Sequence, residues 1–168
     1  MNDKLKDKLE FESLLGELSG ALGRLLAARG VRDPVMLGVQ TGGLVVAQHL
    51  HRAMNIQTPL SALNINFYRD DFSRIGLHPH VGASDIRVPP DDRHVVLVDD
   101  VLHTGRTVRA ALNEIFDYGR PASVVLAVLI DRGGRELPVQ PDACGARAPL
   151  EAGRNIKLCG DTLKIEIV

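Results

Sequence analysis

The chain has 168 residues, of which 45% are apolar and 24% are charged, and its formal net charge is −1. This length fits one α/β domain with a buried core, and the apolar fraction argues against a disordered chain. The near-neutral charge argues against a generic binder of nucleic acid or membrane surfaces, which needs a basic excess, but it leaves room for a local basic face.

The two cysteines, Cys144 and Cys159, lie apart in the sequence without the spacing of metal ligands. Free thiols in a reducing cytosol are the simplest interpretation. The first ten residues, MNDKLKDKLE, lack the apolar core of a signal sequence. No stretch reaches the roughly 18 apolar residues that a membrane span needs. We therefore expect a cytoplasmic protein with no membrane partner.

Helical and extended patterns alternate along the chain. Apolar residues from Phe11 to Leu26 share one helical face and predict a helix over residues 9–29, with Asp7 and Glu10 as a capping box and Gly30 after its end. The remaining predicted elements are strands at 35–39, 60–67, 94–98 and 123–130, helices at 44–54 and 104–118, and a terminal hairpin at 156–158 and 163–168.

The predicted central strands are apolar on both faces. This pattern is typical of a parallel sheet covered by helices on each side, so the fold class is α/β. Two stretches lack periodicity: a long loop that begins at Tyr68, and residues 131–150, which are rich in Gly, Pro and Arg. A loop as long as the first is usually functional or disordered. No internal repeat or boundary divides the chain, which predicts a single domain over residues 1–168.

The segment VVLVDDVLHTGRT, residues 95–107, joins a predicted strand to a predicted helix. The turn Thr104–Thr107 opens the helix, where unpaired backbone N–H groups and two hydroxyls suit a phosphate. Asp99 and Asp100 are hydrogen-bond acceptors at a distance that leaves room for a sugar. The pattern predicts a 5-phosphoribosyl site. A Thr-capped helix preceded by two solvated acids is the alternative.

This segment resembles the phosphoribosyl pyrophosphate (PRPP) signature of type I phosphoribosyltransferases. Three further segments, LNINFYRDD, GRPASVVLAVLIDRGGRELP and the strand followed by TGG at 37–43, resemble the PyrR family. Its members are pyrimidine operon regulators that are also uracil phosphoribosyltransferases. The resemblance covers roughly residues 30–145. It implies the type I phosphoribosyltransferase fold, which has a mainly parallel sheet, a flexible active-site loop and an irregular hood, here residues 131–150 plus the terminal hairpin.

The resemblance also implies roles for the residues of the signature. Asp99 and Asp100 are expected to bind the ribose hydroxyls. Mg²⁺ is expected to arrive with PRPP and to meet these acids through water, with no direct protein ligand, as its preference for waters and phosphate oxygens allows. The 5′-phosphate is expected to bind at His103, Thr104, Gly105, Arg106 and Thr107.

By the same resemblance, Thr41, Gly42 and Gly43 form the pyrophosphate loop. Gly42 stands where members of the family carry an arginine, so one cation is missing from this loop. A tight turn without a ligand is the alternative interpretation of the two glycines. Arg69, at the start of the long loop, is a candidate for contacting pyrophosphate and is expected to act with Asp99 and Asp100 in catalysis. Closure of that loop would exclude water from a reactive sugar centre.

The nucleobase is expected under the hood, against Asp131, Arg132, Ala143 and Cys144. His103 stands where purine-specific relatives often have an aspartate and where pyrimidine-specific members have a tyrosine, which argues mildly against a purine. The implied reaction is uracil plus PRPP giving UMP and pyrophosphate. A purine phosphoribosyltransferase and an RNA-binding regulator with negligible catalysis remain the alternatives.

The family's second role is the binding of pyrimidine-operon leader RNA when UMP or UTP is bound. RNA binding requires a basic face, yet residues 19–24 of the first helix, which contribute to that face in RNA-binding members, hold little positive charge. Relatives are dimers or larger, so we expect a homo-oligomer on analogy alone. The candidates for a basic patch are Arg120, Arg132, Arg135, Arg147, Arg154 and Lys157.

Overall fold

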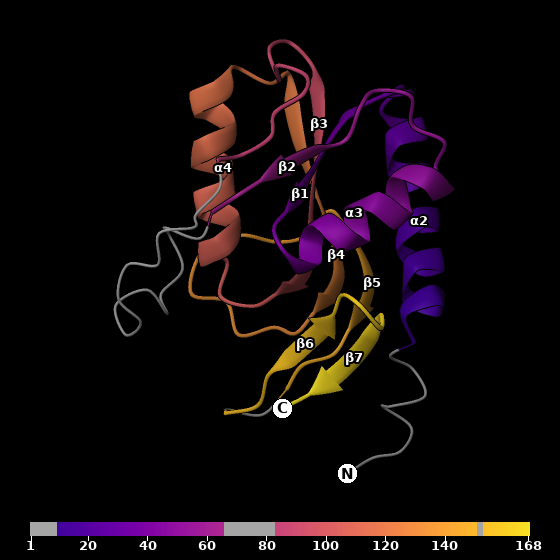
Figure 1. Cartoon of the computed structure of the whole chain (residues 1–168), viewed down its shortest axis with the longest axis vertical. Coiled ribbons are helices and arrows are strands. Elements are labelled where there is room, and N and C mark those ends of the chain that lie inside the picture. Colours follow the sequence, from indigo (N-terminus) through magenta and orange to yellow (C-terminus); the bar gives the residue numbers. More distant parts are fainter. Residues whose placement is uncertain (1–9, 66–82, 151–152) are drawn as a thin grey trace.

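A five-stranded parallel sheet forms the centre of the molecule, with strand order β2-β1-β3-β4-β5 (Figure 1). The computed structural model describes residues 10–65, 83–150 and 153–168. Most of the strand residues are buried, as the apolar sequences predict. The strands are β1 (Val35–Val39), β2 (Ser61–Leu63), β3 (His94–Leu102), β4 (Ser123–Asp131) and β5 (Ala143–Arg147).

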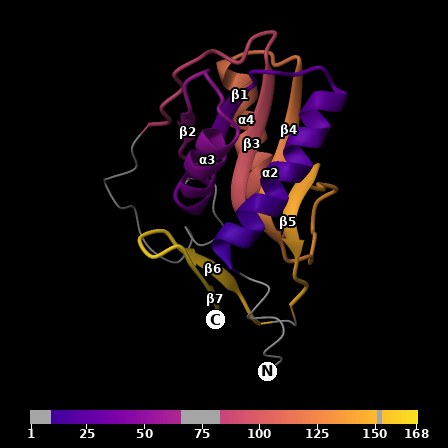
Figure 2. The same cartoon turned by 90° about the vertical axis from the view of Figure 1, so that its right-hand side faces the viewer.

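Helices cover both faces of this sheet, which gives a three-layer arrangement (Figure 2). The helices α2 (Phe11–Ala28) and α3 (Gly42–Ala53) pack on one face, and α4 (Arg106–Tyr118) packs on the other. Leu18 and Leu22 of α2 are fully buried, and each contributes about 2 kcal/mol of apolar burial. Within the described residues, none of the helices has the length and the apolar character that crossing a membrane requires.

The chain ends in an antiparallel hairpin of β6 (Ile156–Cys159) and β7 (Lys164–Ile167). Ile156 is buried in the core on the α2 and α3 side, and Ile165 and Ile167 pack against the same core. The hairpin lies beyond the carboxyl end of β3 (Figure 1). This placement gives the hairpin a part in whatever binds at that end of the sheet.

Most predicted elements are confirmed with small shifts at their ends. Gly30 follows the first helix with a φ of 68°, and its N–H donates to the Ala27 carbonyl, as a residue after a helix end should. Glu10 is the N-cap residue but makes no side-chain capping bond, and Asp7 lies outside the described residues. The strand predicted at 60–67 is shorter, because β2 ends at Leu63, and residues 66 and 67 lie outside the described part.

Two predictions about the sheet are wrong. The strand predicted to end at Val98 continues to Leu102, because Asp99 pairs with Val128 and Val101 pairs with Ile130 in the ladder with β4. The segment 131–150 is not irregular throughout, because it contains β5. This strand is weakly apolar, and it includes Gly145, where a Cβ would lie 2.6 Å from the Leu14 carbonyl of α2 and 2.7 Å from that of Leu129. Close packing with α2 therefore outweighs a poor strand propensity.

The amino ends of three strands are tied together by Asp33, Thr58 and Arg93. Asp33 accepts hydrogen bonds from the backbone N–H groups of Gln57 (2.9 Å) and Thr58 (3.0 Å) and from the Thr58 hydroxyl (2.7 Å). Arg93 donates to the same hydroxyl at 3.1 Å. The bonds from the Thr58 backbone N–H and hydroxyl hold the pKa of the Asp33 carboxyl below its ordinary value, with the positive charge of Arg93 as a smaller cause.

Candidate functional site

A cleft of about 400 Å³ lies at the carboxyl ends of β1 and β3, where ligands bind in open α/β sheets. The turn into α3, the end of β3, the start of the hood and the terminal hairpin all reach it. Its lining residues are Thr41, Gly42, Asp100, Val101, His103, Arg132, Asn155, Ile156, Lys157 and Leu158.

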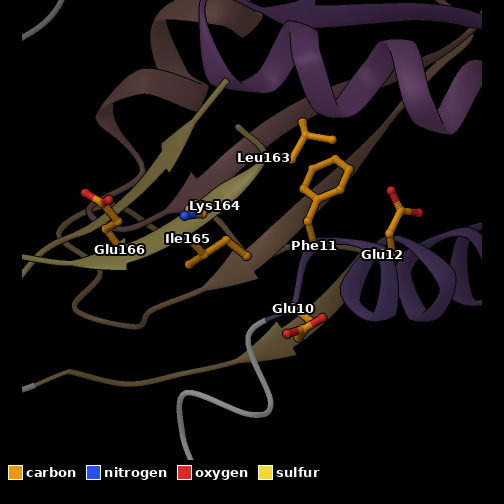
Figure 3. Close-up of a pocket in the computed structure, with 7 residues that line it drawn as sticks. All are labelled: Glu10, Phe11, Glu12, Leu163, Lys164, Ile165 and Glu166. Atoms are coloured by element: carbon orange, nitrogen blue, oxygen red, sulfur yellow. The ribbon is translucent and has the colours of Figure 1, made fainter. Parts of the chain in front are cut away.

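A second hollow, of about 420 Å³, lies between the start of α2 and the strand β7 (Figure 3). Its lining includes Glu10, Glu12 and Glu166, with Lys164 as the basic residue. An excess of carboxylates repels a phosphorylated substrate. The cleft at the strand ends is therefore the better candidate for such a substrate.

The two acids of β3 have different environments. Successive side chains of a strand leave on opposite faces, and only Asp100 lines the cleft. Asp99 is 3% exposed, and its Oδ1 accepts a hydrogen bond of 3.0 Å from the backbone N–H of Asp100. Of the two acids predicted to bind the ribose, the structure places Asp100 in the cleft, whereas the continued strand buries Asp99.

The predicted phosphate turn lies between β3 and α4. Gly105 is the N-cap residue of α4 with a φ of 93°, a left-handed conformation that favours glycine. The Thr104 hydroxyl accepts a bond of 3.2 Å from the Arg106 N–H, and the Arg106 side chain turns outward to Glu136 at 2.7 Å. The first turn of α4 holds no acidic residue, so the positive end of the helix is not neutralised there. Thr107 is half-buried in this first turn.

The predicted pyrophosphate loop is the start of a helix. β1 ends at Val39, and α3 begins at Gly42, two residues earlier than the sequence pattern predicts. The peptide bond between Gln40 and Thr41 is cis. A Cβ at Gly38 would lie 2.7 Å from the Leu44 Cα, so α3 lies directly on β1. This close approach places the backbone N–H groups of the first turn of α3 beside the cleft.

Arg135 fastens the hood to the end of β3. Its guanidinium is 2.6 Å from Asp131 Oδ1 and donates to the backbone carbonyls of His103 (2.9 Å) and Val139 (2.9 Å). Asp131 is 7% exposed and does not line the cleft. Asp131, which the sequence predicts against the base, is paired with Arg135 in the structure and lies outside the cleft lining.

His103 points into the cleft with one nitrogen engaged. Its Nδ1 lies 2.9 Å from the Gly133 carbonyl, which accepts hydrogen bonds only, so Nδ1 carries the proton in the neutral ring. A Cβ at Gly134 would lie 2.6 Å from the ring's Cε1 and 3.8 Å from Nε2. The two glycines therefore lie beside the Nδ1 and Cε1 atoms of the ring, and Nε2 is an acceptor in this tautomer.

Arg132 connects the end of β4 to the start of the hairpin. It donates to the Arg154 carbonyl at 2.6 Å and to the side-chain oxygen of Asn155. Its Nε is buried without a hydrogen-bond partner within the described residues. The structure thus places Arg132 in the cleft, as the sequence predicts, and brings the hairpin to its edge.

The terminal hairpin, predicted as part of the hood, supplies cleft residues that were not among the predicted site residues. Asn155, Ile156, Lys157 and Leu158 line the cleft, although only the hairpin itself was predicted. Ala143 and Cys144, by contrast, are not part of the lining. They pair with Ala127 and Val128, in the middle of β4 and away from its carboxyl end.

The remaining predicted site residue, Arg69, lies outside the described residues, as does the rest of the segment 66–82. In the part of the chain that the structure describes, no three His, Cys, Asp or Glu side chains gather closely enough to hold a metal ion. Asp100 is the carboxylate in the cleft lining.

Comparisons with known proteins identify the family of this chain. The model of the phosphoribosyl transferase domain family matches residues 2–147. A protein of Nitrosococcus oceani named "Bifunctional protein PyrR" is 48% identical over 99% of this chain and 96% of its own. A protein of the same name from Pseudomonas savastanoi is 49% identical over 92% of this chain and 91% of its own.

Solved structures show the same fold. A hypoxanthine phosphoribosyltransferase of Trypanosoma cruzi superposes with a TM-score of 0.67 at 22% identity, covering 94% of this chain and 93% of its own. A hypoxanthine-guanine phosphoribosyltransferase of Bacillus anthracis gives a TM-score of 0.62 at 18% identity, covering 84% of this chain and 80% of its own. At these identities the likeness establishes the fold and leaves the base open.

Proposed function

The chain belongs to the PyrR family of phosphoribosyl transferases, and we propose that it transfers the 5-phosphoribosyl group of PRPP to uracil, giving UMP and pyrophosphate. The observation that carries the proposal is the cleft itself. It joins one carboxylate, Asp100, to the start of α3 on one side and to His103 on the other, and residues 104–107, which lead from His103 into α4, follow it in the chain but are not part of the lining. Two helix starts that flank one acid suit a sugar with an anionic group at each end.

Each part of PRPP has a place in this proposal. The 5′-phosphate binds the backbone N–H groups of residues 104–107 and the hydroxyls of Thr104 and Thr107. The ribose hydroxyls donate to Asp100, and buried Asp99 acts by holding the Asp100 backbone. The pyrophosphate binds at Thr41, Gly42 and Gly43, at the positive end of α3.

Catalysis in this proposal comes from position and charge. Uracil N1 attacks C1′ as the bond from C1′ to pyrophosphate breaks, so the chain's task is to align these groups and to stabilise the leaving anion. Mg²⁺ bound to PRPP supplies charge neutralisation of the pyrophosphate, and Asp100 fits it because Mg²⁺ prefers a few carboxylate oxygens beside phosphate and water. Arg69 is proposed to contact pyrophosphate as its segment excludes water.

The base is proposed to bind between Arg132 and the hairpin. Arg132, His103 and Lys157 supply polar groups at that end of the cleft. Asp131 contributes by holding Arg135. The relatives at 48% and 49% identity carry the PyrR name, whereas the likeness to hypoxanthine enzymes is one of fold, so uracil is favoured over a purine.

The experiment that tests the function is a product assay. The purified chain is incubated with PRPP, Mg²⁺ and one of uracil, hypoxanthine, guanine or xanthine, and the nucleotides are separated by chromatography. We expect UMP alone. Conversion of a purine without UMP would overturn the choice of base, and no nucleotide from any base would overturn the transferase proposal.

Binding of pyrimidine-operon leader RNA in response to UMP or UTP is a second proposed function, favoured by the word "Bifunctional" in the names of the relatives. The six predicted cations do not form one patch. Arg120 precedes β4 and Arg132 follows it, which separates them by about 30 Å at 3.3 Å per residue. Arg132 and Arg135 are also engaged within the chain. The exposed pair Arg154 and Lys157, at the hairpin, is the better candidate for RNA.

A filter-binding assay with leader RNA tests this role. We expect UMP to raise the affinity, and we expect Arg154→Gln, at an exposed position outside the cleft lining, to lower it about threefold, since one phosphate contact is lost. RNA binding that does not change with UMP would remove the regulatory role.

We further propose that the chain forms a single domain over residues 1–168 and lies in the cytoplasm. We also propose a homodimer or larger homo-oligomer, which light scattering would measure.

A further inference from the structure

The turn from β3 into α4 has its backbone carbonyls bonded to the hood. The Arg132 N–H donates to the Leu102 carbonyl at 3.0 Å. Two successive N–H groups of the hood, those of Glu136 and Leu137, donate to the Thr104 carbonyl at 3.0 and 3.1 Å. These bonds come from the backbone, so they fix the first and the last of three successive carbonyls whatever side chains the hood carries.

The middle carbonyl, that of His103, is held by a side chain. The Arg135 guanidinium donates to it at 2.9 Å and donates to the Val139 carbonyl at 2.9 Å. A longer bond of 3.4 Å reaches the Leu102 carbonyl. The Asp131 carboxylate lies 2.6 Å from the same guanidinium, and only 13% of the Arg135 side chain is exposed. Arg135 therefore joins the hood to the turn, with its charge compensated in a largely buried place.

The orientation of these carbonyls sets the orientation of the N–H groups of the turn. A trans peptide unit is planar, and its carbonyl and its N–H point in opposite directions. Because the carbonyls of residues 102–104 face the hood, the N–H groups of residues 103–105 face away from it. Thr104 and Gly105 are among the residues whose N–H groups bind the 5′-phosphate in the proposed function. The bonds to the hood thus decide where these donors point.

We propose that Arg135 is a positioning residue for the 5′-phosphate of the substrate. By holding the His103 carbonyl, its guanidinium keeps the Thr104 N–H directed at the phosphate, while the side chain itself lies outside the cleft lining. The planar fork of an arginine suits acceptors placed around it, whereas an ammonium group concentrates its donors at one point. This inference rests on the proposed function and adds a residue that acts on the phosphate through the backbone of the turn.

The test compares the dissociation constants of UMP and uridine, which differ only in the 5′-phosphate, by displacement calorimetry on the full chain. For the native chain we expect UMP to bind at least about 100-fold more tightly, since the phosphate accepts two or more strong hydrogen bonds. Arg135→Lys keeps a positive charge beside Asp131. It should lower this preference about tenfold, the size of one lost hydrogen bond to a charged group, with UMP weakened and uridine unchanged within about twofold.

The matched control is Arg29→Lys, the same substitution at the end of α2. Arg29 also forms an ion pair, with Asp142 at 3.4 Å, but it lies outside the cleft lining and makes no bond to the turn among the described residues. This variant should keep the native preference for UMP over uridine.

A second variant separates the positioning role from an effect on the fold. Asp131→Asn combined with Arg135→Met removes both charges of the buried pair, which proteins tolerate better than the loss of one partner. The double variant also lacks the donor to the His103 carbonyl, so it should show the same loss of preference. In both variants the KM for PRPP should rise about tenfold and the KM for uracil should stay within about threefold. General damage to the hood would raise both.

The inference is overturned if folded Arg135→Lys and the folded double variant keep the native preference for UMP over uridine. It is equally overturned if they lose affinity for both ligands to the same extent. Binding of UMP by the native chain no tighter than that of uridine would instead overturn the proposed function, because the chain would then have no site for the 5′-phosphate.

Discussion

The two edges of the central sheet are built for different purposes. At the amino edge, Asp33, Thr58 and Arg93 form a closed network, and His51 Nε2 lies 2.8 Å from the Thr58 carbonyl. At the carboxyl edge, the chain keeps a cleft, close-packed glycines and a buried Arg132 Nε that has no partner within the described residues. One edge is closed by hydrogen bonds, whereas the other leaves polar groups available to a ligand.

This difference separates stability from activity. Changes at the amino edge should alter the free energy of unfolding and leave the transfer reaction alone, because no residue there reaches the cleft. Changes to side chains of the carboxyl edge should lower the rate of the transfer reaction and leave the free energy of unfolding nearly unchanged.

The largest effect is expected from Asp100→Asn. Removing the carboxylate charge that faces the sugar should lower kcat/KM for UMP formation by about 100-fold, which is typical of losing one stabilising group in a transition state. The melting temperature should change by less than about 2 °C, because the side chain lies in the cleft and not in the core. Near-normal turnover would mean that Asp100 is not in the ribose site.

Gly43→Ala tests whether the carboxyl edge also contains residues that the fold requires. The new methyl group would press on the Val98 carbonyl oxygen at 2.7 Å, so we expect a loss of about 1–3 kcal/mol in the free energy of unfolding, measured in urea. Gly16→Ala, on the exposed side of α2, should be neutral or stabilise by up to about 1 kcal/mol. Equal stability of the two variants would show that α3 has room to move away from β3.

The sequence predicts the strands and helices that border this site better than the side chains that line it. Apolar strands and the motif at 95–107 predict the turn between β3 and α4 and an acid at the strand end, because strand ends and helix starts are local features. Asp99 shows where prediction from local sequence fails. Adjacent acids in a sequence suggest two equivalent ligands, but the ladder with Val128 continues past Val98 and buries one of them.

The base end of the cleft depends on contacts that are distant in sequence. Arg132 reaches Asn155, and Arg135 reaches His103, so the hairpin and the hood are placed by side chains that no periodicity reveals. Ala143 and Cys144 lie in β5, outside the cleft lining, and this strand has a weak strand pattern and gains its place from packing on α2. Long-range packing, rather than local propensity, decides these positions.

A smaller effect is expected from Asp33→Ala at the amino edge. The carboxylate accepts three hydrogen bonds, two of them from backbone N–H groups, but the side chain is exposed. We therefore expect a loss of about 1–2 kcal/mol in the free energy of unfolding, as for a lost helix cap. UMP formation at 25 °C should stay within twofold of the native rate. A large loss of activity with unchanged stability would break the division between the edges.

The smallest effect is the pH dependence that Asp33 contributes. Its pKa is lowered in the folded chain from an ordinary value of 3.8, first by the hydrogen bonds from Thr58. A lowered pKa means that the unfolded chain binds the proton more readily. The stabilisation is therefore complete above pH 3.8 and is lost as the pH falls through the lower folded value.

Urea unfolding of the native chain and of Asp33→Asn, at pH 7 and at stepwise lower pH, measures this contribution of Asp33 to stability. The difference in unfolding free energy between the native chain and Asp33→Asn should be constant near neutrality. It should narrow only below the ordinary pKa of an aspartate, since the asparagine does not titrate. If the difference in unfolding free energy between the two chains instead narrows between pH 7 and pH 5, another group causes the pH dependence. The Asp33 carboxylate would then not be the charged acceptor that stabilises the amino edge.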